Sequence, residues 1–112
     1  MQTIDYEDFA KLEFRAGTII RVENFEKARK PAYKIWVDLG EELGIRKSSA
    51  QITDLYSPED LIGRMVVCVV NFNPRQIADF MSEILITGFP DEQGHVVLTS
   101  IERKVPNGSK LF

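Results

Sequence analysis

Three stretches of the sequence carry residue types that could bind a polymer. The first mixes cations with aromatic rings, at Lys27, Arg29, Lys30, Tyr33, Lys34 and Trp36. Cations can neutralise phosphates while aromatic faces stack on bases, so this mixture suits single-stranded nucleic acid. The same residues equally suit a solvated loop that leads into a strand whose aromatic side chains, Trp36 included, pack against the protein.

The second stretch, Arg46 to Gln51, places two cations beside small hydroxyl side chains and an amide on a predicted strand. Lys47, Ser48, Ser49 and Gln51 could hydrogen-bond the backbone of a polymer. An exposed edge strand also carries charge, because charge blocks unwanted strand pairing. Both interpretations therefore fit the stretch.

The third stretch, Asn71 to Glu83, alternates polar and apolar residues in what we expect to be a connection between strands. Loops at the mouth of a barrel often carry binding residues. The apolar side chains in this stretch therefore either bind a ligand or plug the end of the barrel. They are Phe72, Ile77, Phe80 and Met81.

No catalytic or metal-binding set is found. His95, the only histidine, lies in a polar turn with no Cys/His cluster or Ser/His/acid set around it. Cys68 lies within an apolar run and should pack as a small hydrophobic residue. The adjacent carboxylates fit turns or helix starts, and no Gly-rich phosphate loop is present. We therefore expect a protein that is not an enzyme and needs no cofactor or metal.

Length and charge predict a single acidic domain. The chain has 112 residues, so we expect one domain over residues 1–112. Its formal net charge is −3 and its pI about 5.2, which argues against a generic nucleic-acid binder but allows a local basic patch. No apolar run is long enough to span a membrane, and no secretory signal is visible, so we expect a cytoplasmic protein.

The order of predicted elements favours a small barrel. Hydrophobic patterns predict a short helix over Asp5 to Leu12 and a helix that starts at Ser57 and ends at Gly63. The predicted strands are Phe14 to Val22, Tyr33 to Leu39, Ile45 to Ile52, Met65 to Phe72, Glu83 to Thr87 and Val96 to Thr99. The fourth of these is nearly all apolar and is expected to be the central, buried strand. Gly17 is expected to mark a bend or bulge. Three strands, a helix and further strands fit an all-β, five-stranded OB-fold barrel, although other small barrels fit nearly as well.

Seven segments in order give the chain a specific family resemblance. They are Phe25–Ile35, Val37–Gly40, Lys47–Ile52, Val70–Phe72, Pro74–Ile77, Ser82–Glu83 and Val105–Gly108. Together they resemble the CsaA family of secretion-associated chaperones, which belongs to the tRNA-binding-domain superfamily together with the C-terminal domain of methionyl-tRNA synthetases. The resemblance covers essentially the whole chain.

The resemblance implies an OB fold and a homodimer formed through extensions at both ends. It also implies binding of unfolded or pre-secretory polypeptides, contact with the translocation ATPase, and tRNA binding as an alternative in the same groove. The implied peptide-binding residues are Phe72, Ile77, Phe80 and Met81. The implied tRNA-binding residues are Lys47, Ser48, Ser49, Gln51, Asn71, Arg75 and Ser82.

Two features refine this expectation. Ala78-Asp79 stands where we expect a Gly-Pro turn in the family, and Asp79 would add negative charge beside Arg75, which favours peptide over tRNA as the ligand. Apolar residues also lie near both ends of the sequence, among them Ile4, Tyr6 and Phe112. Since termini are usually polar, we expect the barrel or a second subunit to cover them.

Overall fold

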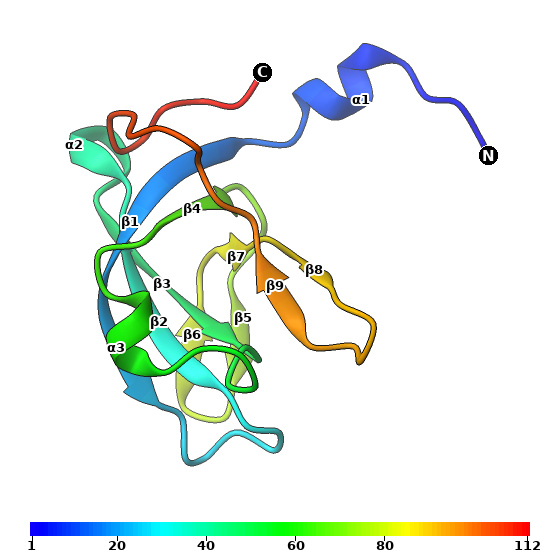
Figure 1. The fold of residues 1–112 in the computed structure, drawn as a ribbon. Coiled ribbons are helices and arrows are strands. Elements are labelled where there is room, and N and C mark those ends of the chain that lie inside the picture. Colours follow the sequence, from blue (N-terminus) through cyan, green and yellow to red (C-terminus); the bar gives the residue numbers. More distant parts are fainter.

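The computed structural model describes all of residues 1–112 and contains an antiparallel sheet curled into a nearly closed barrel (Figure 1). The five strands of this sheet follow the order β3-β2-β1-β4-β7, and two short hairpins, β5–β6 and β8–β9, are added to it. The elements are α1 (Tyr6–Ala10), β1 (Phe14–Asn24), β2 (Tyr33–Asp38), α2 (Gly40–Leu43), β3 (Ile45–Ala50), α3 (Pro58–Leu61), β4 (Met65–Val69), β5 (Arg75–Ile77), β6 (Phe80–Ser82), β7 (Leu85–Ile86), β8 (Gly88–Pro90) and β9 (Val96–Leu98). The predicted all-β OB-fold barrel with short helices is confirmed.

Strand β2 shows how the sequence pattern builds the core. Its alternation puts Tyr33, Ile35 and Val37 inside the barrel, each at most 6% exposed, and leaves Lys34 and Trp36 on the outer face. The inner residues join one buried cluster that includes Cys68 and Leu61. Period-two patterning therefore fixes which side chains are available on the outside of the sheet.

Strand β1 contains a bulge, but not at Gly17 as predicted. The pairing with β2 shifts between Ile19 and Arg21, so Ile20 is the extra residue. The shift puts Arg21 opposite Trp36 on the outer face, while Val22 still packs on the core. The bulge therefore adds a cation to the outer face of the barrel without breaking the inner pattern.

Gly17 is required for a different reason, which is close packing. A Cβ atom at this position would lie 2.5 Å from Cγ1 of Val37 and 2.7 Å from Cδ2 of Leu39. We therefore expect Gly17→Ala to lower the free energy of unfolding by about 1–3 kcal/mol through overpacking. Urea denaturation measures this, and an unchanged midpoint would show that β1 and β2 are not held this closely.

Helix α3 begins as predicted. Ser57 is the N-cap residue, its Oγ accepts from the Asp60 amide, and the Asp60 carboxylate accepts from the Ser57 amide. This capping box lowers the pKa of Asp60, because both backbone and side-chain hydrogen bonds from Ser57 favour the ionised form. No helix has both the length and the hydropathy to span a membrane; α1, the longest, has five residues.

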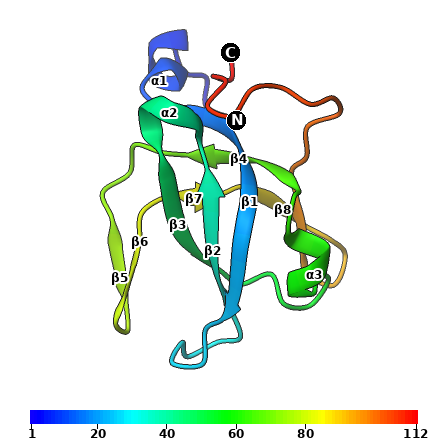
Figure 2. The ribbon, with the colours of Figure 1, turned by 90° about the vertical axis from the view of Figure 1, so that its left-hand side faces the viewer.

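Three predictions about the second half of the chain are wrong. Strand β4 ends at Val69 rather than Phe72, and β1, not β4, occupies the centre of the sheet. The segment expected to be a connection, Asn71 to Glu83, contains the β5–β6 hairpin, which stands beside β3 (Figure 2). Three-residue strands are too short to give a clear periodic signal, so the pattern did not reveal them.

Candidate functional site

A second, smaller apolar cluster lies outside the barrel, on the outer face of the sheet. Phe25 and Ala32 from the β1–β2 loop meet Phe80 from β6, and all three are at most 6% exposed. The Phe80 ring centroid lies 5.4 Å from that of Phe25 and 6.0 Å from that of Trp36. This aromatic cluster fixes the β5–β6 hairpin against β2 and the β1–β2 loop.

Cations cover the aromatic cluster. The Lys34 ammonium lies 4.9 Å from the centroid of Phe25 and 5.3 Å from that of Phe80. Lys47 lies 5.5 Å from Phe80, and the Arg21 guanidinium lies 4.4 Å from Trp36. These cation–π contacts hold positive charge on the outer face of the sheet. Trp36 is therefore covered rather than free to stack on a base.

The hairpin is also tied to the free edge of β3. The amide of Ser49 donates to Ser82 Oγ (3.1 Å), and the amide of Lys47 donates to Glu83 Oε1 (3.1 Å). The amide of Glu83 donates to the Lys47 carbonyl (2.8 Å). Because these bonds satisfy the edge of β3, this edge is not open for strand addition.

The hairpin separates two grooves. The first, which we call the basic groove, has a volume of about 530 Å³ and lies between the β1–β2 loop and the hairpin. Four cations and no carboxylate line it. Its lining residues are Lys27, Ala28, Arg29, Lys30, Ala32, Ser49, Gln51, Arg75, Gln76, Ile77 and Ala78.

The second groove, which we call the amphipathic groove, has a volume of about 330 Å³ and lies on the other side of the hairpin. Phe72 and Leu85 are about half exposed here, at 50% and 48%. Its lining residues are Ser48, Ser49, Phe72, Asn73, Arg75, Ile77, Ser82, Glu83, Ile84 and Leu85. The mixture of apolar side chains, hydroxyls and one cation suits an extended polypeptide better than a phosphate chain.

The structure brings together six of the predicted site residues. Ser49, Arg75 and Ile77 line both grooves. Gln51 lines the basic groove, while Phe72 and Ser82 line the amphipathic groove.

The other five predicted residues are placed differently. Phe80 is buried, Lys47 lies over its ring, and Met81 is exposed outside both grooves. Ser48 pairs with Ile35 and is only 2% exposed, so it lines the amphipathic groove with almost no accessible surface. The fifth, Asn71, lines neither groove and is hydrogen-bonded to another segment, described below.

The predicted site set did not include Lys27, Arg29 and Lys30, which line the basic groove. The sequence does show these three residues as a run of cations just before β2. What the sequence could not give was the position of this loop, which depends on Phe25 and Ala32 packing against a hairpin more than forty residues away in the chain.

Asp79 contacts a different cation from the one expected. Its carboxylate lies 2.8 Å from the Lys27 ammonium, not beside Arg75. The hydrogen bond and charge of Lys27 lower the pKa of Asp79, and those of Asp79 raise the pKa of Lys27. Asp79 follows Ala78, which has a φ of 53°, in the two-residue turn between β5 and β6.

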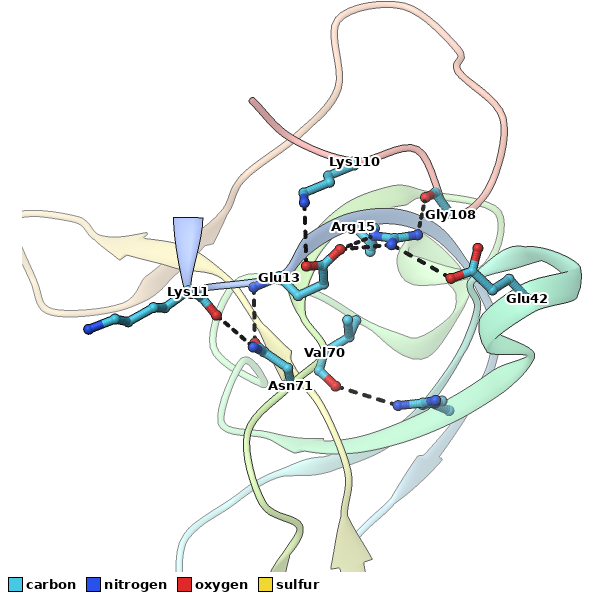
Figure 3. Close-up of polar contacts among 9 residues, drawn as sticks. Lys11, Glu13, Arg15, Glu42, Val70, Asn71, Gly108 and Lys110 are labelled. Atoms are coloured by element: carbon cyan, nitrogen blue, oxygen red, sulfur yellow. Dashed lines mark hydrogen bonds and ion pairs between the residues drawn. The ribbon is translucent and has the colours of Figure 1, made fainter. Parts of the chain in front are cut away.

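Asn71 anchors the segment after α1 to the end of β4 (Figure 3). Its Oδ1 accepts from the Glu13 amide (2.9 Å), and its Nδ2 donates to the Lys11 carbonyl (2.7 Å). Both ends of the Asn71 amide are thus used within the fold, which gives Asn71 a structural role, and its part in ligand binding stays a prediction.

Arg15 joins the same region to the C-terminal segment (Figure 3). Its guanidinium donates to Glu13 Oε1 (2.7 and 2.9 Å) and to the Gly108 carbonyl (3.0 Å). Residues 108–111 then pair with β1, where the Leu111 amide donates to the Phe14 carbonyl (3.0 Å). The hydrogen bonds from Arg15 lower the pKa of Glu13.

This lowered pKa gives a pH prediction. A carboxylate whose folded pKa is depressed stabilises the fold above its unfolded pKa, and that stabilisation is lost as the pH falls through the folded pKa. We expect Glu13→Gln to be less stable than the wild type at neutral pH, and the difference to narrow below about pH 4. Urea midpoints measured across pH check this, and a difference independent of pH would contradict it.

No cluster of three or more His, Cys, Asp or Glu residues could hold a metal ion. Cys68 is buried in the core, and burial raises the pKa of its thiol to about 12. A larger hollow of about 610 Å³ lies between β1 and residues 100–107. It has no counterpart to the aromatic cluster, so we place the candidate site at the two grooves.

The barrel and its added hairpin define an all-β domain of the OB-fold class. Over residues 14–110 the sequence matches the family described as "Putative tRNA binding domain", and the chain belongs to this family. It is 47% identical to the chaperone CsaA from Bacillus anthracis, covering 99% of this chain and 100% of that one with a TM-score of 0.93. It is 41% identical to the CsaA chaperone protein from Picrophilus torridus, covering 98% and 100%, again with a TM-score of 0.93.

The family also occurs inside larger enzymes. The chain is 32% identical to a methionine–tRNA ligase from Methanocaldococcus jannaschii, over 99% of this chain but 17% of the ligase. The chain thus spans about a sixth of the length of the curated relatives it matches.

Proposed function

We propose that the chain is a polypeptide-binding chaperone that acts in the cytoplasm as a homodimer, without catalytic activity, on unfolded or pre-secretory chains. The observation that carries this proposal is the similarity to two proteins named CsaA chaperones, which extends over nearly the full length of both partners. The methionine–tRNA ligases, by contrast, match through only a small part of their length.

The amphipathic groove is the peptide site in this proposal. Apolar side chains of an extended segment contact Phe72, Ile77 and Leu85, which are partly exposed. Asn73 and Arg75 are positioned on the same groove to donate hydrogen bonds to the peptide backbone carbonyls. Exposed apolar surface with polar residues around it is typical of a site for another chain.

A matched pair of variants tests this site. Phe72→Ser combined with Leu85→Ser removes two half-exposed apolar side chains from the groove, and we expect presequence-peptide affinity to fall about tenfold or more. Leu55→Ser combined with Ile62→Ser removes two similarly exposed side chains, 43% and 50%, elsewhere on the surface. Fluorescence anisotropy should show little change for this control, and equal losses in both variants would reject the groove.

Homodimer formation is proposed to involve the N-terminal helix and the C-terminal segment. Helix α1 extends away from the barrel, and Ile4 and Tyr6 are each 70% exposed (Figure 1). Phe112 is fully exposed beside the segment that pairs with β1. A second subunit would bury these side chains. Native mass spectrometry should find a dimer, and Ile4→Ser with Tyr6→Ser should shift it to monomer.

tRNA binding is the second candidate, and the basic groove favours it. Four cations line this groove without a carboxylate. If tRNA phosphates contact them, the logarithm of the affinity falls linearly with the logarithm of salt concentration. A titration at two salt concentrations tests this, and undetectable or salt-independent binding would remove the candidate.

A further inference from the structure

One ion pair bridges the two walls of the basic groove. Lys27 belongs to the β1–β2 loop and Asp79 to the turn of the β5–β6 hairpin, yet their charged atoms are 2.8 Å apart. Lys27 and Ala28 line one wall of the groove, and Gln76 and Ala78 line the other. The pair therefore spans the groove at the point where loop and hairpin meet.

The position of Asp79 is fixed by its neighbours. Asp79 precedes the buried Phe80, and the register pairs Ile77 with Phe80 directly across the two-residue turn. The carboxylate consequently stays next to the groove, where its charge acts on Lys27 first and also on Lys34. Apart from this carboxylate, the four cations of the groove have no acidic partner within ion-pair distance.

Stability of the fold does not explain the pair. The side chains of Lys27 and Asp79 are 71% and 57% exposed. Exposed pairs of this kind contribute little to stability. The hairpin does not need this one, because Phe80 is already buried beneath the loop. The same weakness means that a phosphate could displace the carboxylate, but only by competing with it for Lys27.

We propose that Asp79 is a specificity-determining residue that lowers the affinity of the basic groove for polyanions by occupying Lys27. A phosphate chain must either displace the carboxylate or leave Lys27 unused, and it meets the negative charge of Asp79 in both cases. A peptide in the amphipathic groove meets neither penalty, since Asp79 does not line that groove. The inference rests on the second proposed function, tRNA binding at the basic groove.

The test compares Asp79→Asn with Glu26→Gln in titrations with tRNA at 50 and 200 mM salt. Both substitutions remove one negative charge. The exposed Glu26 is next to Lys27 in sequence but has no ion-pair partner within 4 Å. We expect Asp79→Asn to raise tRNA affinity about five- to tenfold at the lower salt and to steepen the salt dependence by about one. Glu26→Gln should change the affinity less than about twofold.

A double-mutant cycle isolates the mechanism. In the Lys27→Gln background, Asp79→Asn should raise the logarithm of the tRNA affinity by less than half as much as it does in the wild type. The substitution frees Lys27 in the wild type, and that cation is absent in this background. If Asp79→Asn and Glu26→Gln raised tRNA affinity equally, the effect would come from net charge alone, and the proposal would be overturned. An Asp79→Asn variant that binds no more tRNA than the wild type, whatever the wild-type affinity, would also overturn it. Peptide affinity, measured on the same samples, tests the chaperone proposal separately and should not change.

Discussion

Replacing Phe80 by alanine should lower the free energy of unfolding by about 3 kcal/mol or more. Phe80 is 6% exposed and packs against Phe25 and Trp36, with Lys34 and Lys47 above its ring. Its truncation leaves a cavity and removes the contact that fixes the hairpin to the β1–β2 loop. Since the hairpin forms a wall of both grooves, we expect peptide and tRNA affinities to fall together.

The adjacent Met81 provides the control. It is 40% exposed and lies outside both grooves, so Met81→Ala should change the free energy of unfolding by about 0.5 kcal/mol or less and leave both affinities unchanged. Urea denaturation and peptide titration of the two single variants measure this. Selective loss of peptide binding in a fully stable Phe80→Ala protein would contradict the account and support the sequence-based expectation that Phe80 contacts the peptide.

Removing three cations from the basic groove should produce the largest change in ligand affinity. We expect the variant with Lys27→Gln, Arg29→Gln and Lys30→Gln to bind tRNA roughly a hundredfold more weakly at 0.1 M salt, with a salt slope smaller by about two to three. Each cation lost removes the release of about one counterion. Presequence-peptide affinity should change little, because none of the three lines the amphipathic groove.

A variant of equal charge on other surfaces is the control. Lys11→Gln, Arg103→Gln and Lys104→Gln also remove three positive charges, from exposed positions outside the basic groove. If the two triple variants lose tRNA affinity equally, binding depends on overall charge and the basic groove is not the site. If the first variant keeps its affinity, other residues hold the tRNA.

The barrel could be predicted because its strands are long and its alternation is clear. Tyr33, Ile35, Val37 and Leu39 fall inside as the pattern indicates, and Ser57 caps its helix. The position of the bulge could not be predicted from the sequence. A glycine within a strand fits a bend or a close contact equally well, and Gly17 proved to be needed for close packing while the bulge lies at Ile20. The β5–β6 hairpin was also missed, since strands of three residues depend on a buried anchor, Phe80, rather than on periodicity.

The sequence predicted only some of the residues that line the two grooves. Arg75, Ser49 and Ile77 were among the predicted site residues and line both grooves, and their part in binding stays a prediction. The sequence could not separate Ser48 from Ser49, because that depends on the register of β3 against β2. It assigned Asn71 to the ligand because the contacts with Lys11 and Glu13, some sixty residues earlier, are visible only in three dimensions.

Net charge was a poor guide to the surface. The chain carries a formal charge of −3, yet seven of its fourteen Lys and Arg residues gather around the aromatic cluster and the basic groove. They are Arg21, Lys27, Arg29, Lys30, Lys34, Lys47 and Arg75. Local potential, rather than overall pI, therefore decides whether a polyanion can bind this face.

The most direct test of the account is a side-by-side titration of the purified protein with a presequence peptide and with tRNA, each at 50 and 200 mM salt. If the peptide occupies the amphipathic groove, its affinity should change less than about threefold between the two conditions. tRNA held by the basic groove should weaken at least about tenfold over the same range. Failure to bind the peptide at either salt concentration, or a salt dependence as steep as that of tRNA, would contradict the proposed chaperone function.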